Sequence, residues 1–237
     1  MRIAMWSGPR NLSTAMMYAF AQRDDFAVWD EPFYAAYLHA TGIIHPMQDE
    51  ILAAGERDPN LVITKCLGPV PDGKSHFYQK HMTHHMIPDF DRSWIAKVTN
   101  VFLIRHPARV IASYAAKRDE LTLDDIGFRQ QLDLYRQVKS MGQNPIVIDS
   151  VDIRANPEQT LNRLCKCLNI PFDDKMLRWP AGGNPADGAW APHWYGAVHR
   201  STGFADPEGP LPDISDEHRQ ICADAFENYE ELRQHVI

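Results

Sequence analysis

The sequence has no run of apolar residues long enough to cross a bilayer, so we expect no membrane-spanning segment. It also has no hydrophobic signal region, because the apolar residues near its N-terminus already form the pattern of a first strand. Only four cysteines are present (Cys66, Cys165, Cys167 and Cys222), and we expect them to be reduced thiols of a cytoplasmic protein. Cys165 and Cys167 lie two apart in a helical pattern and face different directions, so no shared metal is expected.

Positive charge is also scarce. Lysine and arginine number 24 against 31 acidic residues, which gives a formal net charge of −7. This balance argues against nucleic acid as a partner, and against highly sulfated or phosphorylated polymers, because such ligands require basic grooves. It remains compatible with a small basic pocket for a nucleotide.

The 237 residues instead alternate between strand-like and helix-like patterns. Strands are predicted near residues 2–6, 26–29, 61–65, 100–105 and 146–149. Helices are predicted near residues 13–23, 33–40, 76–87, 107–117, 123–141, 157–168 and 214–235. The alternation predicts one α/β domain over residues 1–237, with three α/β/α layers and a central, mainly parallel sheet of about five strands. Residues 179–211 are rich in Pro, Gly, Trp and His, which is typical of a lid or binding segment.

The turn after the first predicted strand carries the main functional signal. The apolar run Ile3–Trp6 breaks into S-G-P-R-N-L-S-T, and a helical pattern follows. The first N–H groups of a helix lack intrahelical partners, and the helix dipole favours an anion beside them. Arg10 adds a positive fork, and two hydroxyls add donors. The residues predicted to form this phosphate-binding loop are Gly8, Pro9, Arg10, Asn11, Leu12, Ser13 and Thr14.

This loop is not a Walker A motif, which requires G-x-x-x-x-G-K-[ST] with a lysine for the terminal phosphates. Here the lysine is missing and Arg10 carries the charge. The alternative interpretation is an ordinary strand-to-helix turn in which Asn11 or Ser13 caps the helix.

A second segment, Asn100–Pro107, reads NVFLIRHP and predicts a buried strand that ends in Arg105. Open α/β sheets bind ligands at the carboxyl ends of their strands. Ser113 lies about two turns into the helix that follows, so it can share a ligand with Arg105. The alternative is a surface arginine and an unrelated helical serine.

Together the two segments resemble the sulfotransferase family. In many bacterial and carbohydrate members the first loop reads like R-S-G-S-T, and residues 10–14 occupy the same register. The family's second motif, hhhRxPxxxxxSY, is matched by FLIRHP at residues 102–107 and by Ser113-Tyr114. A weaker match covers Val147–Phe172. In this chain Leu12 stands where the family usually has glycine, whose bare backbone lets a phosphate approach closely.

The resemblance implies a P-loop NTPase-like fold and in-line transfer of a sulfuryl group from 3′-phosphoadenosine 5′-phosphosulfate (PAPS) to a hydroxyl or amine of a small acceptor. Arg105 and Ser113 would bind the 3′-phosphate. A basic C-terminal loop with His199, Arg200, Ser201 and Gly203 would close the site, and Trp194 would cover the adenine. The alternative is a packed surface loop. No metal is expected, because a sulfuryl group carries less negative charge than a phosphoryl group. The net charge favours a neutral or cationic acceptor.

Glu31 is the first candidate for the general base, because it follows the second predicted strand and comes near the first loop. Some carbohydrate sulfotransferases place a glutamate there. The alternative is that Asp30 or Glu31 caps a helix that begins at Pro32. In the proposed step the base removes the acceptor's proton, while Arg10, Ser13 and the loop N–H groups stabilise the leaving oxygen.

A histidine of the cluster Lys80–His85 is the second candidate. Cytosolic sulfotransferases use a histidine just after a lysine in a comparable region, and His81 or His84 would line the acceptor pocket. His81 and His85 would share a helical face. A solvated helix face is the alternative interpretation.

Two other functions remain open. The run Ile146–Asp149 is similar to a strand that ends in a magnesium-binding aspartate, which would fit a magnesium-dependent nucleotide phosphotransferase. Leu12 in the first loop would fit a catalytically silent nucleotide-binding protein. The acceptor and the oligomeric state are not encoded in any motif of the sequence.

Overall fold

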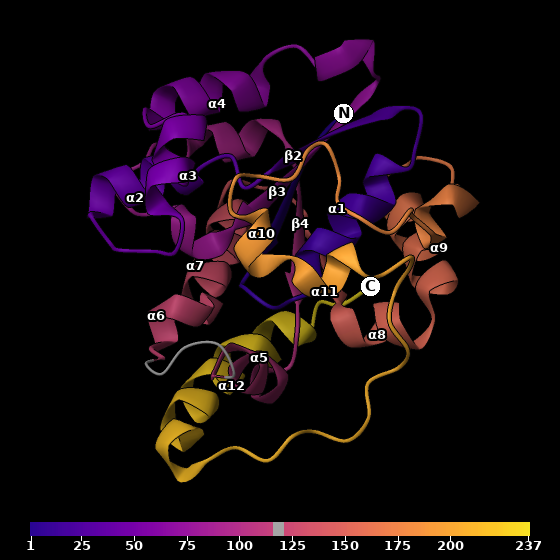
Figure 1. The fold of residues 1–237 in the computed structure, drawn as a ribbon. Helices are drawn as coiled ribbons and strands as arrows, with labels where there is room; N and C mark the ends of the chain where they lie inside the picture. The colour runs from indigo at the N-terminus through magenta and orange to yellow at the C-terminus, as the bar shows by residue number, and fades with distance from the viewer. Residues whose placement is uncertain (116–120) are drawn as a thin grey trace.

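The computed structural model describes residues 1–115 and 121–237. At its centre lies a five-stranded sheet with the order β2-β3-β1-β4-β5, in which every neighbouring pair is parallel (Figure 1). The strands are β1 (Arg2–Ser7), β2 (Phe26–Asp30), β3 (His76–Met82), β4 (Thr99–Ile104) and β5 (Ile146–Asp149). The predicted α/β fold with a parallel sheet of about five strands is therefore confirmed.

Helices cover the sheet. In the described residues they are α1 (Ser13–Ala21), α2 (Tyr34–Thr41), α3 (Gln48–Ala54), α4 (Pro59–Leu67), α5 (Pro107–Ala115), α6 (Leu123–Ile126), α7 (Phe128–Ser140), α8 (Ser150–Ala155), α9 (Pro157–Cys167), α10 (Ala191–Trp194), α11 (Gly196–His199) and α12 (Arg219–Arg233). None of these helices combines the length and the apolar character that a bilayer crossing requires.

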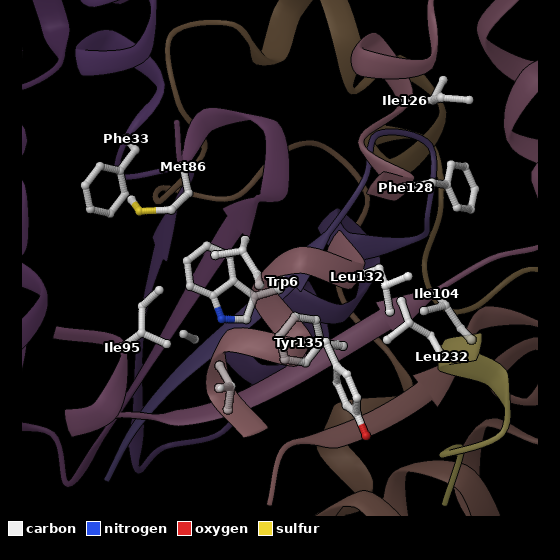
Figure 2. Close-up of a cluster of buried hydrophobic side chains, with 14 of the residues drawn as sticks. Trp6, Phe33, Met86, Ile95, Ile104, Ile126, Phe128, Leu132, Tyr135 and Leu232 are labelled. Atoms are coloured by element: carbon white, nitrogen blue, oxygen red, sulfur yellow. The ribbon is translucent and has the colours of Figure 1, made fainter. Parts of the chain in front are cut away.

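The side chains of β1 alternate between two clusters of buried residues, one on each face of the sheet. Ile3 and Met5 share a cluster with apolar residues of α1 and α9. Ala4 and Trp6 share the other cluster with residues of α7 and α12, and Figure 2 draws Trp6, Leu132 and Leu232 among its side chains. Because both faces are covered, β1 is apolar over most of its length, and the sheet lies between two helical layers.

The sequence pattern misplaces one strand. Residues 61–65, predicted as a strand, lie in α4, and residues 76–82, predicted within a helix, form β3. The start of α4 carries a recognisable signal. The Asp58 side chain accepts a hydrogen bond from the Asn60 N–H at 2.8 Å, and Pro59 occupies the first turn. Val62, Ile63 and Thr64 of α4 are β-branched and favour a strand, so the sequence pattern predicted a strand here.

β3 was missed because polar residues fill a strand that is buried on both faces. β3 lies inside the sheet, because it pairs with both β1 and β2. Its residues Gln79, Lys80 and His81 are each at most 2% exposed. Their polar atoms find partners from distant parts of the chain. The Gln79 amide, for example, donates to the Cys66 carbonyl at 2.8 Å. A run of this kind lacks the apolar pattern by which a buried strand is recognised.

The remaining helix predictions agree with the structure apart from their ends. The predicted helix at 107–117 corresponds to α5, and its last two residues lie outside the described residues. The predicted helix at 123–141 is divided into α6 and α7 by Gly127, which has φ +70°. A Cβ atom at Gly127 would lie 2.7 Å from the Thr83 hydroxyl, so a close approach of two segments requires glycine here. The sequence pattern predicted neither α3, α8, α10 nor α11.

A buried amide ties the central strands to their surroundings and generates a stability prediction. Asn100 on β4 is 2% exposed, accepts from the Trp6 indole N–H at 2.9 Å and donates to the Ile95 carbonyl at 3.0 Å. We expect Asn100→Leu to lower the free energy of unfolding by about 2 kcal/mol or more, because it leaves the buried Trp6 donor without a partner. Urea unfolding measures this. The exposed Asn144→Leu is the control and should stay within about 0.5 kcal/mol. Equal stabilities of the two variants would contradict the prediction.

Candidate active site

A cavity of about 350 Å³ opens where β1, β2 and β3 end. The first turn of α1, residues at the ends of β2 and β3, and part of the segment 190–205 line it. Ligands of open parallel sheets bind at this edge, because the loops after neighbouring strands converge there. Three regions that the sequence singled out separately, the first loop, Glu31 and the C-terminal segment, therefore meet around one space.

The β1–α1 loop presents an uncapped helix start to this cavity. Leu12 is the N-cap residue of α1, and no side chain caps the helix. The first helical hydrogen bond runs from the Met16 N–H to the Leu12 carbonyl at 3.1 Å, so the N–H groups of the preceding turn have no helical acceptor. The predicted loop residues that line the cavity are Pro9, Arg10, Asn11, Leu12, Ser13 and Thr14. Such a helix start favours an anion, and the alternative of a turn capped by Asn11 or Ser13 is wrong.

Leu12 takes the backbone conformation that glycine adopts without strain. Its φ is 71°, and Arg10 two residues earlier has φ 62°, so both lie in the left-handed region. For a residue with a side chain this costs about 1–2 kcal/mol. Asn11 is buried and its amide donates to the Leu103 carbonyl at 3.2 Å, which anchors the loop to β4. The loop keeps a glycine-like path although it lacks the glycine.

Gly8 does not line the cavity. A Cβ atom at Gly8 would lie 2.5 Å from the Ile126 carbonyl oxygen, so this glycine permits the backbone to pass the end of α6. The structure gives Gly8 a packing role, and its predicted contact with phosphate stays a prediction.

Two guanidinium groups lie side by side in the cavity wall. The Arg10 Nε donates to the Ser113 hydroxyl of α5 at 2.8 Å, and the Arg105 Nη1 donates to the Arg10 carbonyl at 2.6 Å. Burial, and then the positive charge of Arg105, lower the pKa of Arg10. Within residues 1–115 and 121–237, no carboxylate forms an ion pair with Arg10. An anion in the cavity would therefore relieve an uncompensated positive charge.

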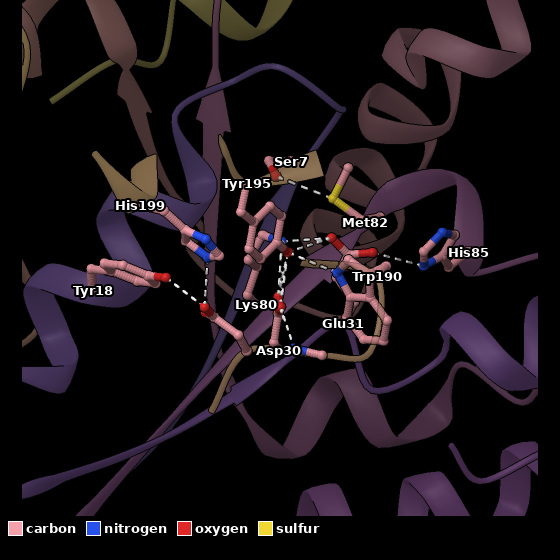
Figure 3. A network of polar contacts seen from close by, with 12 residues as sticks. Ser7, Tyr18, Asp30, Glu31, Lys80, Met82, His85, Trp190, Tyr195 and His199 are labelled. Atoms are coloured by element: carbon pink, nitrogen blue, oxygen red, sulfur yellow. Dashed lines mark hydrogen bonds and ion pairs between the residues drawn. The ribbon is translucent and has the colours of Figure 1, made fainter. Parts of the chain in front are cut away.

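A buried lysine organises the opposite wall (Figure 3). Lys80 on β3 is 1% exposed, and its Nζ donates to Glu31 at 2.6 Å, to Asp30 at 2.9 Å and to the Tyr195 hydroxyl at 2.6 Å. Burial alone lowers the pKa of Lys80, but the charges of Asp30 and Glu31 outweigh it and raise this pKa above its ordinary value. Lys80 thus stays charged and fixes both carboxylates.

Glu31 holds one carboxylate oxygen toward Lys80 and the other toward a histidine. Its Oε2 lies 3.9 Å from the His85 Nδ1, and its backbone is held in the left-handed region at φ 40°. Burial raises the pKa of Glu31, although Lys80 opposes this shift. Helix α2 begins at Tyr34 without a side-chain cap, so the alternative in which Asp30 or Glu31 caps that helix is wrong.

The structure separates the histidines that the sequence grouped together. His81 stacks on Trp6 with ring centroids 4.6 Å apart and does not line the cavity. His84 and His85 line it, in a short turn after β3, so the predicted helical face shared by His81 and His85 is wrong, and so is the solvated helix. Burial lowers the pKa of His84 to about 4, and this ring is therefore neutral near pH 7.

The C-terminal loop contributes some of its predicted residues to the cavity. Trp194, Ser201 and Gly203 line it. Arg200 is exposed and lies outside the lining, and His199 contacts Asp187 at 3.0 Å instead. The structure therefore does not bring His199 or Arg200 to the cavity.

Four residues in and around the site were not predicted from the sequence: Tyr195, Glu208, Arg109 and Arg154. Tyr195 joins the Lys80 network from far along the chain. Glu208 lies buried among arginines and contacts Arg109 with 2.8 Å between Nε and Oε2, and Arg154 with 2.9 Å between Nη1 and Oε1. Arginines in a helix and a glutamate in a loop are common, so the sequence does not distinguish these residues. Their contacts with one another in the folded structure do.

Asp149, the candidate magnesium ligand, lies away from the cavity. It accepts hydrogen bonds from the Val151 N–H at 3.0 Å and from the Tyr229 hydroxyl at 2.7 Å, and it is 3% exposed. Asp149 therefore caps α8 and joins that helix to α12.

Fold and site together define an α/β protein with a cavity at the carboxyl edge of a parallel sheet, beside a helix start whose free N–H groups favour an anion. A family model for the sulfotransferase domain matches residues 1–235. The chain belongs to this sulfotransferase family, as the two motifs predicted.

One curated relative is branched-chain-amino-acid aminotransferase-like protein 2 of Arabidopsis thaliana. It is 36% identical over 234 residues, which are 99% of this chain and 42% of that protein. The chain thus spans less than half the length of the curated relative that it matches.

Solved structures agree with the fold. The sulfotransferase domain of the Synechococcus PCC 7002 olefin synthase superposes with a TM-score of 0.52 at 18% identity, covering 97% of this chain and 94% of that one. A mouse sulfotransferase complexed with PAP gives a TM-score of 0.51 at 11% identity, covering 99% and 89%. At these identities the likeness shows the fold, and it confirms the predicted P-loop-like architecture.

The position of His81 generates a prediction about pH. Burial lowers its pKa in the folded chain to about 3, whereas an unfolded histidine titrates near its ordinary value of about 6.5. The unfolded state therefore binds more protons below about pH 6.5, and stability falls as the pH falls, by about 1.4 kcal/mol per pH unit for this group. Between pH 6 and pH 4, we expect the free energy of unfolding to fall by about 2–3 kcal/mol less in His81→Phe than in wild type. Urea unfolding at both pH values measures it, and parallel losses in the two proteins would refute it.

Proposed function

We propose that this chain transfers a sulfuryl group from PAPS to a hydroxyl or amine of a small acceptor. The observation that carries the proposal is Arg10, a largely buried guanidinium that lines the cavity beside Arg105 and the uncapped start of α1 without an ion-pair partner among the described residues. Arg10 and the helix start lack a counter-charge, and Arg105, which Glu208 holds in this structure, lies beside them, so the site favours an anion with more than one charged group. Membership of the sulfotransferase family supports the choice of PAPS.

The donors in the cavity fit the two anionic ends of such a co-substrate. The N–H groups before Met16, with the hydroxyls of Ser13 and Thr14, would bind the 5′-phosphosulfate. Arg105 and Ser113 would bind the 3′-phosphate. The mouse relative was solved with PAP, which supports the assignment to this chain. Trp194, whose indole N–H is buried without a partner, offers an aromatic surface at the same cavity.

Glu31 is our candidate for the general base. PAPS supplies the sulfuryl group, and the chain must remove one proton from the acceptor and stabilise charge on the leaving oxygen. Burial raises the pKa of Glu31, which makes it a stronger base than an exposed glutamate. Its Oε2 faces His85, while Lys80 holds the other oxygen in place. Arg10 and the first N–H groups of α1 would stabilise the leaving group.

The rest of the cavity fits a small acceptor. Tyr34, Trp190 and the uncharged ring of His84 give it aromatic walls, and Glu31 and Asp125 are the acidic residues that line it. Aromatic faces and carboxylates attract cations and repel anions. We therefore propose a small acceptor that is neutral or cationic. We also propose that transfer requires no metal.

The alternatives differ in their ligands. A phosphotransferase would need a magnesium ligand in the cavity, and Asp149 is occupied elsewhere. A silent binding protein would bind PAP and PAPS but would not transfer the sulfuryl group of PAPS to any acceptor.

Calorimetric titration tests the co-substrate. We expect wild type to bind 3′-phosphoadenosine 5′-phosphate without metal, and Arg10→Ala and Arg105→Ala each to weaken binding at least about tenfold, because each removes charge-assisted hydrogen bonds. Arg136→Ala, which breaks an exposed ion pair with Glu231, is the matched control and should bind as wild type does. Affinity for magnesium-ATP alone would favour the phosphotransferase.

Glu31→Gln tests the base. This change keeps the shape of the side chain but removes its proton affinity, so we expect sulfuryl transfer to fall about 100-fold or more while PAP affinity stays within about twofold. In wild type, the base should lose its proton at a pH above that of an ordinary glutamate, because burial raises the pKa of Glu31. Transfer of labelled sulfate from PAPS measures both effects, with the exposed Glu50→Gln as control. Unchanged transfer in Glu31→Gln would exclude this glutamate as the base.

A further inference from the structure

Three arginines from two helices and a strand end converge on one glutamate. Glu208 has a side chain that is 2% exposed, and it forms ion pairs with Arg105, with Arg109 of α5 and with Arg154 of α8. The Arg109 contact is 2.8 Å and the Arg154 contact is 2.9 Å. Arg105 and Arg154 also line the cavity, so this cluster forms one end of it.

The edge of Arg105 that a phosphate would use already holds a carboxylate. Its Nε and Nη2 both donate to Glu208 Oε1, and its Nη1 donates to the Arg10 carbonyl. A guanidinium binds a phosphate or a carboxylate best through paired, parallel N–H groups. Arg105 therefore cannot offer this edge to a phosphate and to Glu208 at the same time.

The segment that carries Glu208 is attached mainly through the same arginines. Residues 205–211 lie in the long loop that Figure 1 shows between α11 and α12, and they belong to no helix or strand. Arg154 Nε donates to the Asp206 carbonyl at 2.8 Å, and Arg109 donates to the Gly209 carbonyl. Residues 205–207 and 209–211 are exposed, and among the described residues no backbone ladder holds them. A loop anchored by side chains can leave its site without unfolding an element.

We infer that Glu208 is an internal occupant of the anion site, and that a phosphate of the co-substrate must displace it, so that residues 205–211 gate the site and select for a nucleotide with a second phosphate. The inference rests on the proposed use of PAPS. A carboxylate carries one negative charge and a phosphate monoester carries up to two, so three arginines favour the phosphate once it is present. Without it, Glu208 keeps the arginines paired.

The test compares two nucleotides that differ in one phosphate. PAP and adenosine 5′-monophosphate are titrated into wild type, Glu208→Gln and the control Glu217→Gln, an exposed residue. We expect Glu208→Gln to bind PAP about tenfold or more tightly, because no carboxylate competes, while the affinity for the monophosphate stays within about twofold. Glu217→Gln should match wild type for both ligands. Weaker binding of PAP by Glu208→Gln, or an equal change for both nucleotides, would overturn the inference.

A second measurement needs no variant. The protease V8 cleaves after glutamate, and the Glu208–Gly209 bond is shielded while Glu208 lies among the arginines. We expect PAP to accelerate cleavage of wild type at this bond several-fold and adenosine 5′-monophosphate to leave it unchanged, as mass spectrometry of the fragments would show. Protection by PAP would mean that the loop closes over the nucleotide and would overturn displacement.

The two proposals fail in different ways. If wild type binds PAP but Glu208→Gln binds it equally well, only the gate is wrong. If neither protein binds PAP, the proposed co-substrate and the gate fall together.

Discussion

Lys80 carries a charge that is almost completely buried, and the groups that compensate it come from two distant parts of the chain. Asp30 and Glu31 lie at the end of β2, and the Tyr195 hydroxyl donates to Asp30 at 2.8 Å. Asp30 also accepts from the Gly188 N–H at 3.2 Å, so the same charge fixes the segment that precedes α10. Removing one partner of such a buried pair costs about 3–5 kcal/mol, since the other charge stays behind. This constraint joins the edge of the sheet to the C-terminal wall and gives Glu31 a fixed orientation.

The opposite side of the cavity shows the reverse balance. Arg10 has no ion-pair partner among the described residues, while Arg105 is paired with Glu208. Uncompensated positive charge in a cavity favours binding of an anion. In our proposal, the Glu208 carboxylate takes the place of this anion until a phosphate displaces it. The charges on the Lys80 side of the cavity are therefore paired and fixed, whereas on the Arg105 side a loop residue supplies the counter-charge. The proposed sulfuryl transfer would use both sides, because the reacting groups must be positioned while the nucleotide enters and leaves.

The sequence predictions succeeded where a structural feature depends on residues that are close together in the sequence. The loop after β1 and the arginine after β4 were predictable because strand, turn and helix start follow each other within about a dozen residues. β3 was not, since Gln79 and Lys80 are buried by partners far away in the chain. His81 was misplaced for the same reason. As part of a helix it would have shared a face with His85, whereas in a strand it faces Trp6.

The sequence by itself determined the α/β class, the strand, turn and helix start at the N-terminus, and the family to which the chain belongs. These depend on neighbouring residues and on backbone geometry. Only the tertiary structure decided which polar residues meet, because Tyr195 reaches Lys80 and Glu208 reaches Arg105 across more than a hundred positions of chain. The fold of the sheet and its covering segments spans such separations, and burial decides which charges must be paired.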